Sequence, residues 1–225
     1  MTTMLGLDTS GALCSVAIYR KSRIVEDTRL VERMHNTVVL EMIDGLLQRE
    51  NVVKDQLDAV AFTCGPGSFT GVRISAAVAQ GIAFANNALI CPVASSMALA
   101  HAARERAVAN SAKGVLTVIR SRKDSFYLAG FVLEEGELTR VIDDALFAGR
   151  DPPEGLDLCG WVVVGDEPPW RERVPDLRYD AEPKILASLV CELGIRQYQR
   201  GAGLDAAAGL PTYVVGDSPW RPMRG

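Results

Sequence analysis

The chain is arranged around the stretch Cys64-Gly65-Pro66-Gly67-Ser68-Phe69-Thr70-Gly71-Val72-Arg73, because an apolar run ends there and an apolar helix begins. The alternating, partly β-branched segment before it, residues 57–63, predicts a strand. The Ala-rich segment after it, residues 74–85, predicts a helix. Glycine accepts positive φ without steric cost and proline fixes its own φ, so the connection is tight. Ser68 or Thr70 is the expected N-cap.

A turn of this kind directs free backbone N–H groups and the positive end of the helix dipole toward one point, which suits an anion. The spacing from Gly65 to Gly71 fits neither the P-loop nor the dinucleotide-binding pattern, so a capped turn without a ligand remains an alternative. The residues predicted to contact an anion or nucleotide lie in this turn and at the end of the first strand: Asp8, Thr9, Ser10, Gly65, Gly67, Ser68 and Thr70.

Composition narrows the class of protein. A chain of 225 residues with 48% hydrophobic residues can bury a large core, and a net charge of −4 argues against a general polyanion binder. The five cysteines are scattered and never spaced C-x-x-C, which argues against a disulfide framework and a zinc site. The sequence shows no basic leader and no apolar run of about 20 residues, so we expect a cytoplasmic protein without a membrane span.

The pattern along the chain predicts an α/β fold. Residues 4–107 fit the order βββαβαβα, in which three strands form an antiparallel meander before helices and strands alternate. From Val115 three strands follow again, then a strand at Trp161–Gly165 and a helix at Glu182–Gln199. Pro-rich, charged loops are predicted at 148–158 and 166–180.

Two copies of this module, the second abbreviated, make the architecture of the actin-like ATPases, which include actin, the sugar kinases and the heat-shock ATPases. We therefore expect a first domain at 1–110 and a smaller second domain at 111–225, which ends in a tail from Asp217 to Gly225.

The first two helices carry a wide apolar surface. With 100° per residue, the apolar positions between Val38 and Leu47 cover about 200°, against roughly 100° for an ordinary surface helix. Between Val72 and Ala85 only Arg73, Ser75 and Gln80 are polar. This pattern favours a helix-pair interface with another subunit, and coverage by the chain itself is the alternative. The predicted interface residues are Val39, Leu40, Met42, Ile43, Leu46, Leu47, Val72, Ser75, Val78, Ala79 and Ile82.

Several motifs together resemble one family. They are Leu7-Asp8-Thr9-Ser10, Cys14-Ser15-Val16-Ala17, His35, Gly65-Pro66-Gly67-Ser68-Phe69-Thr70-Gly71-Val72-Arg73-Ile74 and Pro92-Val93-Ala94-Ser95-Ser96. These residues resemble the TsaB family of threonylcarbamoyladenosine biosynthesis proteins, formerly called YeaZ.

The resemblance implies a small, non-catalytic paralogue of TsaD with an actin-like fold. It implies that this subunit pairs with TsaD and, with TsaE and after TsaC has made threonylcarbamoyl-adenylate, supports modification of the adenosine 3′-adjacent to the anticodon. It also implies that the two N-terminal helices form the subunit interface, with TsaD or, when that partner is absent, with a second copy. We therefore expect a scaffold subunit that meets tRNA through the complex and does not contact a membrane.

Missing chemistry supports the non-catalytic interpretation. The sequence has two histidines, His35 and His101, and neither a helical metal-binding pair nor a nucleophile triad can be built from them. The alternative is an actin-fold nucleotide-binding ATPase or small-molecule kinase, in which Asp8 holds Mg²⁺ through water. Against it, the strand Val115–Ile119 runs into Arg120 rather than an acidic phosphate loop. No bound cofactor is predicted, and ATP or ADP at the complex interface is left open.

One segment departs from the family pattern. Arg120-Ser121-Arg122, with Lys123 next to it, stands where relatives carry Asp-Ala-Arg, so the charge is reversed. We expect a solvated cluster of charges, with contact to tRNA phosphates as the alternative.

Overall fold

The computed structural model describes residues 2–31, 34–122 and 125–214, so the predicted tail and Lys123 lie outside the described residues. The strands are β1 (Thr3–Asp8), β2 (Leu13–Arg20), β3 (Arg23–Leu30), β4 (Ala59–Gly65), β5 (Leu89–Ala94), β6 (Gly114–Arg122), β7 (Ser125–Glu134), β8 (Glu137–Ala148), β9 (Trp161–Gly165) and β10 (Arg178–Asp180). The helices are α1 (His35–Arg49), α2 (Phe69–Asn86), α3 (Ser95–Ala109) and α4 (Ala187–Gln199), with 3₁₀ turns η1 (Lys54–Gln56), η2 (Arg171–Arg173) and η3 (Ala206–Ala208).

The strands form two mixed sheets, which confirms the predicted α/β class. Their orders are β3-β2-β1-β4-β5 and β8-β7-β6-β9-β10. In the first sheet β1, β2 and β3 are antiparallel neighbours, and β4 and β5 run parallel to β1. In the second sheet β6, β7 and β8 are antiparallel neighbours, and β9 and β10 run parallel to β6. In the order of elements along the chain, the segments 149–160 and 166–177 of the second half take the places that α1 and α2 have in the first half.

The chain divides into two compact units. Unit 1 comprises Met1–Ala98 and Lys184–Pro211, and unit 2 comprises Leu99–Pro183 and Thr212–Gly225. This division differs from the expected ranges 1–110 and 111–225, because α4 packs on strands β1, β2 and β4 of the first sheet. The segment after α4 also stays with unit 1, since Leu204 exchanges two backbone hydrogen bonds with Ile90 of β5, at 2.8 and 2.9 Å.

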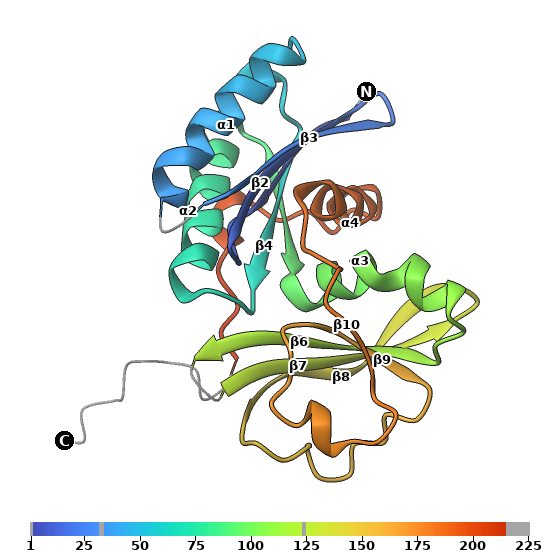
Figure 1. The fold of residues 1–225 in the computed structure, drawn as a ribbon. Coiled ribbons are helices and arrows are strands. Elements are labelled where there is room, and N and C mark those ends of the chain that lie inside the picture. Colours follow the sequence, from blue (N-terminus) through green and yellow to red (C-terminus); the bar gives the residue numbers. More distant parts are fainter. Residues whose placement is uncertain (1, 32–33, 123–124, 215–225) are drawn as a thin grey trace, which may run out of the picture. The chain divides into compact units, whose positions relative to one another are not determined.

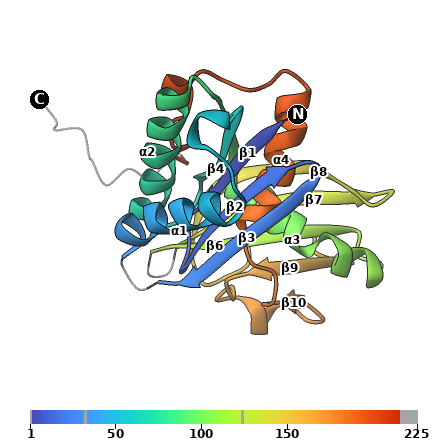
Figure 2. The ribbon, with the colours of Figure 1, turned by 90° about the horizontal axis from the view of Figure 1, so that it is seen from above.

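Unit 1 is a sheet covered on both faces. Successive side chains of a strand point to opposite faces. Leu5 and Leu7 of β1 belong to a buried cluster with α1 and α2, whereas Met4 belongs to a cluster with α4. Figures 1 and 2 show α1 and α2 on one side of this sheet and α4 on the other. Strands buried on both faces need nearly continuous apolar sequence, as the β1 segment TMLGLD has.

Unit 2 has its own core around the second sheet. Its cluster includes Leu116, Phe126, Val163 and the fully buried Trp170. Trp170 comes from the segment between β9 and β10 and so attaches that segment to the sheet. Among the described residues, no helix is long and apolar enough to cross a membrane.

Three boundaries differ from the sequence prediction. The short strand β10 lies inside the predicted loop 166–180 and pairs with β9, and three residues are too few for a periodic signal. The strand predicted at Val115–Ile119 continues to Arg122 in β6, where the Arg120 N–H donates to Asp166 Oδ2 at 2.7 Å. The last helix begins at Ala187 rather than Glu182.

Residues far away in sequence cap the start of α4. The Ala187 N–H donates to Ser15 Oγ at 2.9 Å, and the Ser188 N–H donates to Glu26 Oε2 at 2.8 Å. A hydroxyl and a carboxylate satisfy free N–H groups at a helix N-terminus, and the carboxylate also complements the helix dipole. The preceding residue, Leu186, has no capping side chain, so the local sequence carries no signal for this start.

Two glycines allow α4 to lie close to the first sheet. A Cβ atom on Gly6 of β1 would lie 2.5 Å from Cys191 Sγ and 2.7 Å from Ala187 O. A Cβ atom on Gly194 would overlap Ala61 of β4 and lie 3.1 Å from Met4 Sδ. At Gly6 the space is occupied by a backbone oxygen and a side chain of α4, and at Gly194 it is occupied by side chains of the sheet, so neither position has room for a side chain.

We expect Gly194→Ala to lower the free energy of unfolding by about 1–3 kcal/mol, because overpacking outweighs the better helix propensity of alanine. The matched control is Gly45→Ala in α1, where a Cβ atom meets nothing within 4 Å. That control should raise the free energy of unfolding by about 0.5–1 kcal/mol. Urea denaturation measures both, and a Gly194→Ala chain as stable as the Gly45→Ala chain would contradict the close-packing account.

Candidate functional site

The predicted strand–turn–helix is present at Cys64–Arg73. β4 ends at Gly65, which has φ of +111°, and α2 begins at Phe69. Ser68 is the N-cap, since its Oγ accepts the Gly71 N–H at 3.3 Å. Of the two capping residues that the sequence allowed, the structure uses Ser68.

This turn lies directly against the loop that follows β1. The Ser68 N–H donates to Ser10 O at 2.8 Å, and Thr9 Oγ1 donates to Gly71 O at 2.6 Å. A Cβ atom on Gly67 would lie 2.8 Å from Ser10 O, and one on Gly71 would overlap Thr9 O. The glycines thus admit the chain's own backbone, and the Ser10 carbonyl takes an N–H that an anion could have used.

Asp8 lies beneath this contact and is 1% exposed. Its Oδ1 accepts three hydrogen bonds, from Ser10 N at 3.1 Å, Ser10 Oγ at 2.6 Å and Thr63 Oγ1 at 2.7 Å. Burial raises the pKa of Asp8 and outweighs these hydrogen bonds and the electrostatic effect of His35, which lower it. The carboxylate therefore bonds within its own loop cluster.

The seven residues predicted for an anion or nucleotide do not share one exposed site. Asp8, Thr9, Ser10 and Gly65 are buried, Gly67 is half-buried, and Ser68 and Thr70 are exposed. No group of three His, Cys, Asp or Glu side chains in the described part of the chain could hold a metal ion. The two histidines fall in different units, His35 at the start of α1 and His101 in α3.

Most of the predicted interface residues belong to the core of unit 1, which corrects the sequence interpretation. The following are buried: Val39, Met42, Ile43, Leu46, Leu47, Val72, Ser75 and Ala79. α1 packs on the sheet and also against α2, so two neighbours within the chain use most of the wide apolar arc. Leu40 remains 52% exposed, and Val78 and Ile82 are half-buried.

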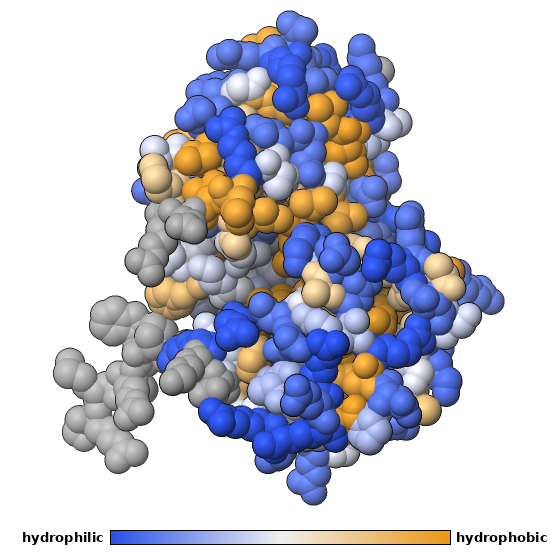
Figure 3. All heavy atoms as spheres, viewed as in Figure 1, coloured by the Kyte–Doolittle hydropathy of each residue, from blue (hydrophilic) through white to orange (hydrophobic). Residues whose placement is uncertain are grey.

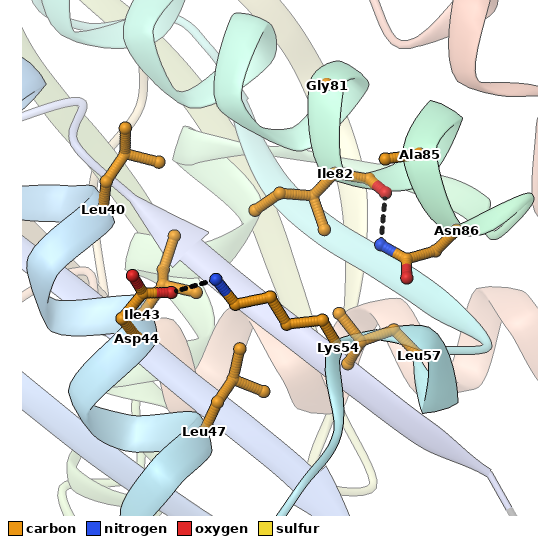
Figure 4. Close-up of a pocket in the computed structure, with 10 residues that line it drawn as sticks. All are labelled: Leu40, Ile43, Asp44, Leu47, Lys54, Leu57, Gly81, Ile82, Ala85 and Asn86. Atoms are coloured by element: carbon orange, nitrogen blue, oxygen red, sulfur yellow. Dashed lines mark hydrogen bonds and ion pairs between the residues drawn. The ribbon is translucent and has the colours of Figure 1, made fainter.

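An apolar groove of about 380 Å³ remains between α1 and α2. Figure 4 shows Leu40 and Leu47 of α1 facing Ile82 of α2 across it, and Figure 3 shows hydrophobic side chains on the face around these helices. Gly81 and Ala85 form the small-residue side of the groove, and both are exposed.

An ion pair crosses the mouth of the groove and was missed by the sequence interpretation. Lys54 Nζ lies 2.6 Å from Asp44 Oδ1, and both side chains are more than half exposed. Lys54 belongs to η1, ten residues from Asp44, so no helical spacing connects the two. A polar pair beside an apolar floor is typical of the rim of an interface.

Comparisons with known proteins match this chain both to the TsaD family model and to curated TsaB proteins. Residues 26–150 match the family model TsaD, described as tRNA N6-adenosine threonylcarbamoyltransferase. The tRNA threonylcarbamoyladenosine biosynthesis protein TsaB of Escherichia coli strain K12 is 32% identical, over 99% of this chain and 98% of that protein. The TsaB protein of Haemophilus influenzae is 38% identical, over 59% of this chain and 55% of that protein.

A solved structure extends the similarity to three dimensions. YeaZ from Pseudomonas aeruginosa superposes with a TM-score of 0.82 and 31% sequence identity, over 95% of this chain and 100% of that chain. With a curated relative above 30% identity along nearly the full length, the chain belongs to the TsaB (YeaZ) family of tRNA threonylcarbamoyladenosine biosynthesis proteins.

Proposed function

We propose that this chain is a non-catalytic scaffold subunit of the complex that forms threonylcarbamoyladenosine on tRNA. In this role it supports a TsaD-type catalytic subunit that modifies the adenosine 3′-adjacent to the anticodon. A TsaE-type ATPase and the tRNA join through the assembled complex, and the chain has an actin-like fold. The observation that carries the proposal is the open apolar groove between α1 and α2.

The groove suits a pair of helices from a related subunit. A Cβ atom on Gly81 would meet nothing within 4 Å, so a partner side chain can reach the backbone of α2 there. The matched range 26–150 includes both α1 and α2, so a TsaD-type protein carries a related segment. Two related helix pairs can pack about an approximate two-fold axis, and a second copy of this chain fits the same geometry when the partner is absent.

The loop cluster supports a structural rather than a catalytic role. A nucleotide-binding ATPase or kinase, the alternative function, would need Asp8 and the Gly67–Ser68 turn to face a ligand. Instead Asp8 Oδ1 accepts from Ser10 and Thr63, and the Ser68 N–H bonds to Ser10 O. These groups already have partners in the chain, so a nucleotide would have to displace internal hydrogen bonds.

We expect Gly81→Leu to weaken association with a TsaD-type partner about tenfold or more, because a leucine there fills the groove from below. The isolated chain should keep its stability, since the position has open space and leucine has higher helix propensity than glycine. Isothermal titration calorimetry gives the dissociation constant.

Gly45→Leu is the matched control, on an exposed position of α1 outside the groove lining. It should change the dissociation constant less than about twofold. Equal effects of the two substitutions would argue against the groove as the binding surface. A charged substitution at Ile43 or Leu46 cannot test the binding surface, because both side chains lie in the core and a charge there would destabilise the fold itself.

Reconstitution tests the role directly. Modification of a substrate tRNA by TsaC-, TsaD- and TsaE-type proteins should fail without this chain and recover when the chain is added. The Gly45→Leu chain should restore modification fully, and the Gly81→Leu chain should restore it poorly at limiting concentration. Mass spectrometry of the tRNA nucleosides gives the yield, and full modification in the absence of the chain would end the scaffold proposal.

The substitution Asp8→Asn distinguishes the scaffold role from the alternative function, a nucleotide-binding ATPase or kinase. If Asp8 only holds its loop, the variant should support reconstituted modification within about twofold, because an amide oxygen still has two lone pairs with which to accept hydrogen bonds from Ser10 and Thr63. Burial raises the pKa of Asp8, so the ionised group is disfavoured in the folded chain, and wild-type stability should rise as pH falls through that raised pKa. The stability advantage of Asp8→Asn over wild type at pH 7 should therefore shrink on acidification, as urea denaturation measures. Micromolar ATP binding by the wild type that disappears in the variant would instead favour the enzyme.

A further inference from the structure

A cluster of positive side chains lies at the end of unit 1 where β2 turns into β3 and α1 ends. It consists of Arg20, Lys21, Arg23 and Arg49, and we call it the hairpin patch. Figure 3 shows strongly hydrophilic side chains at this end of the molecule, where Figure 1 places the C-terminal end of α1. The proposed function does not use these residues.

The strand register brings like charges together. Arg20 and Arg23 are direct partners in the pairing of β2 with β3, and the turn between them consists of Lys21 and Ser22. Both turn residues have positive φ, at 53° and 58°. Like charges directly opposite on neighbouring strands reduce stability, and so does a non-glycine residue in the left-handed region. The fold therefore tolerates an unfavourable arrangement that places three cations in four residues.

Some of this charge has a local structural role. Arg20 Nη1 donates to Asn51 O at 3.3 Å, beside the negative end of the α1 dipole. Glu50 lies 3.4 Å from Arg23 and 3.7 Å from Arg49, and its side chain is 20% exposed. One carboxylate against four cations leaves a local excess of positive charge, and the Arg23 side chain remains 72% exposed.

The cations surround a hollow rather than a flat surface. Ile18 and Val25 contribute apolar lining, and the volume is about 240 Å³. Among the described residues that line it, Arg20, Lys21 and Arg23 are positive and Glu50 is negative. Guanidinium groups bind phosphate oxygens in pairs and stack on bases, so this combination suits an RNA backbone with an adjacent nucleobase.

We propose that the hairpin patch binds the phosphate backbone of the tRNA on which the complex acts, an inference that rests on the proposed function. Charge distribution supports this occupant: the sequence ranges of unit 2 hold four more acidic than basic residues, whereas those of unit 1 hold equal numbers. A polyanion is therefore disfavoured by unit 2 and has a local attractive site on unit 1. The contact would orient the tRNA without reading its sequence.

The test compares two double variants in the complex with a TsaD-type partner. Lys21→Gln/Arg23→Gln removes two exposed patch charges, and Lys113→Gln/Arg200→Gln removes two exposed charges elsewhere. Filter binding of an unmodified tRNA transcript between about 50 and 200 mM KCl gives the dissociation constant and its salt dependence. The patch variant should weaken binding about tenfold at low salt and lower the log–log salt slope by about 1.5, and the control variant should match the wild type.

Other outcomes overturn the inference. Wild-type affinity and slope in the patch variant would show that tRNA does not contact the patch, while reconstituted modification would still report on the scaffold role. Lost association with the TsaD-type partner, measured by gel filtration, would make the patch a protein-binding site. If the wild type and the control variant bind phosphatidylglycerol vesicles and the patch variant does not, while tRNA binding is unchanged, the hairpin patch is a lipid-binding site. If the chain forms no complex with the TsaD-type partner, the scaffold proposal fails. The same tRNA titration on the chain alone then tests whether the hairpin patch binds RNA.

Discussion

The direct contact between the loop after β1 and the N-terminus of α2 is the constraint on which unit 1 depends. The Ser68 N–H bonds to Ser10 O, Thr9 Oγ1 bonds to Gly71 O, and a side chain on Gly71 would occupy the position of Thr9 O. Contacts between two backbones leave little freedom, so they determine where α2 begins and how it lies against α1.

The sequence predicted those elements whose signals lie within their own residues. The strands β1 to β3 follow from short segments separated by turn residues, and the start of α2 follows from a glycine-rich turn with a capping serine. The start of α4 could not be predicted, because Ser15 and Glu26, which cap it, belong to strands more than 160 residues earlier. The placement of α4 with unit 1 depends on the same distant contacts, and this is why the expected domain boundary differs.

The sequence predicts an interface on the first two helices, and the structure places an apolar groove between them that only some of the predicted residues line. Arc width alone cannot distinguish a subunit interface from a helix that packs on its own sheet and on a neighbouring helix, and α1 does both. The more informative signal was the small residues Gly81 and Ala85, because small side chains on an exposed helix face leave its backbone open to a partner. The Lys54–Asp44 pair at the rim depends on η1, whose position no local pattern gives.

The closed loop cluster and the open groove are both compatible with the proposed scaffold role. Asp8 is costly to bury, but three hydrogen bonds to its Oδ1 reduce that cost and tie β1, β4 and the loop between β1 and β2 together. A helix held at its N-terminus by such a network loses less conformational freedom when a partner binds, and preorganisation of this kind increases affinity without added contact area. In the proposed scaffold role, the motif that resembles a phosphate-binding turn in the sequence would contribute to association by holding α2 in place.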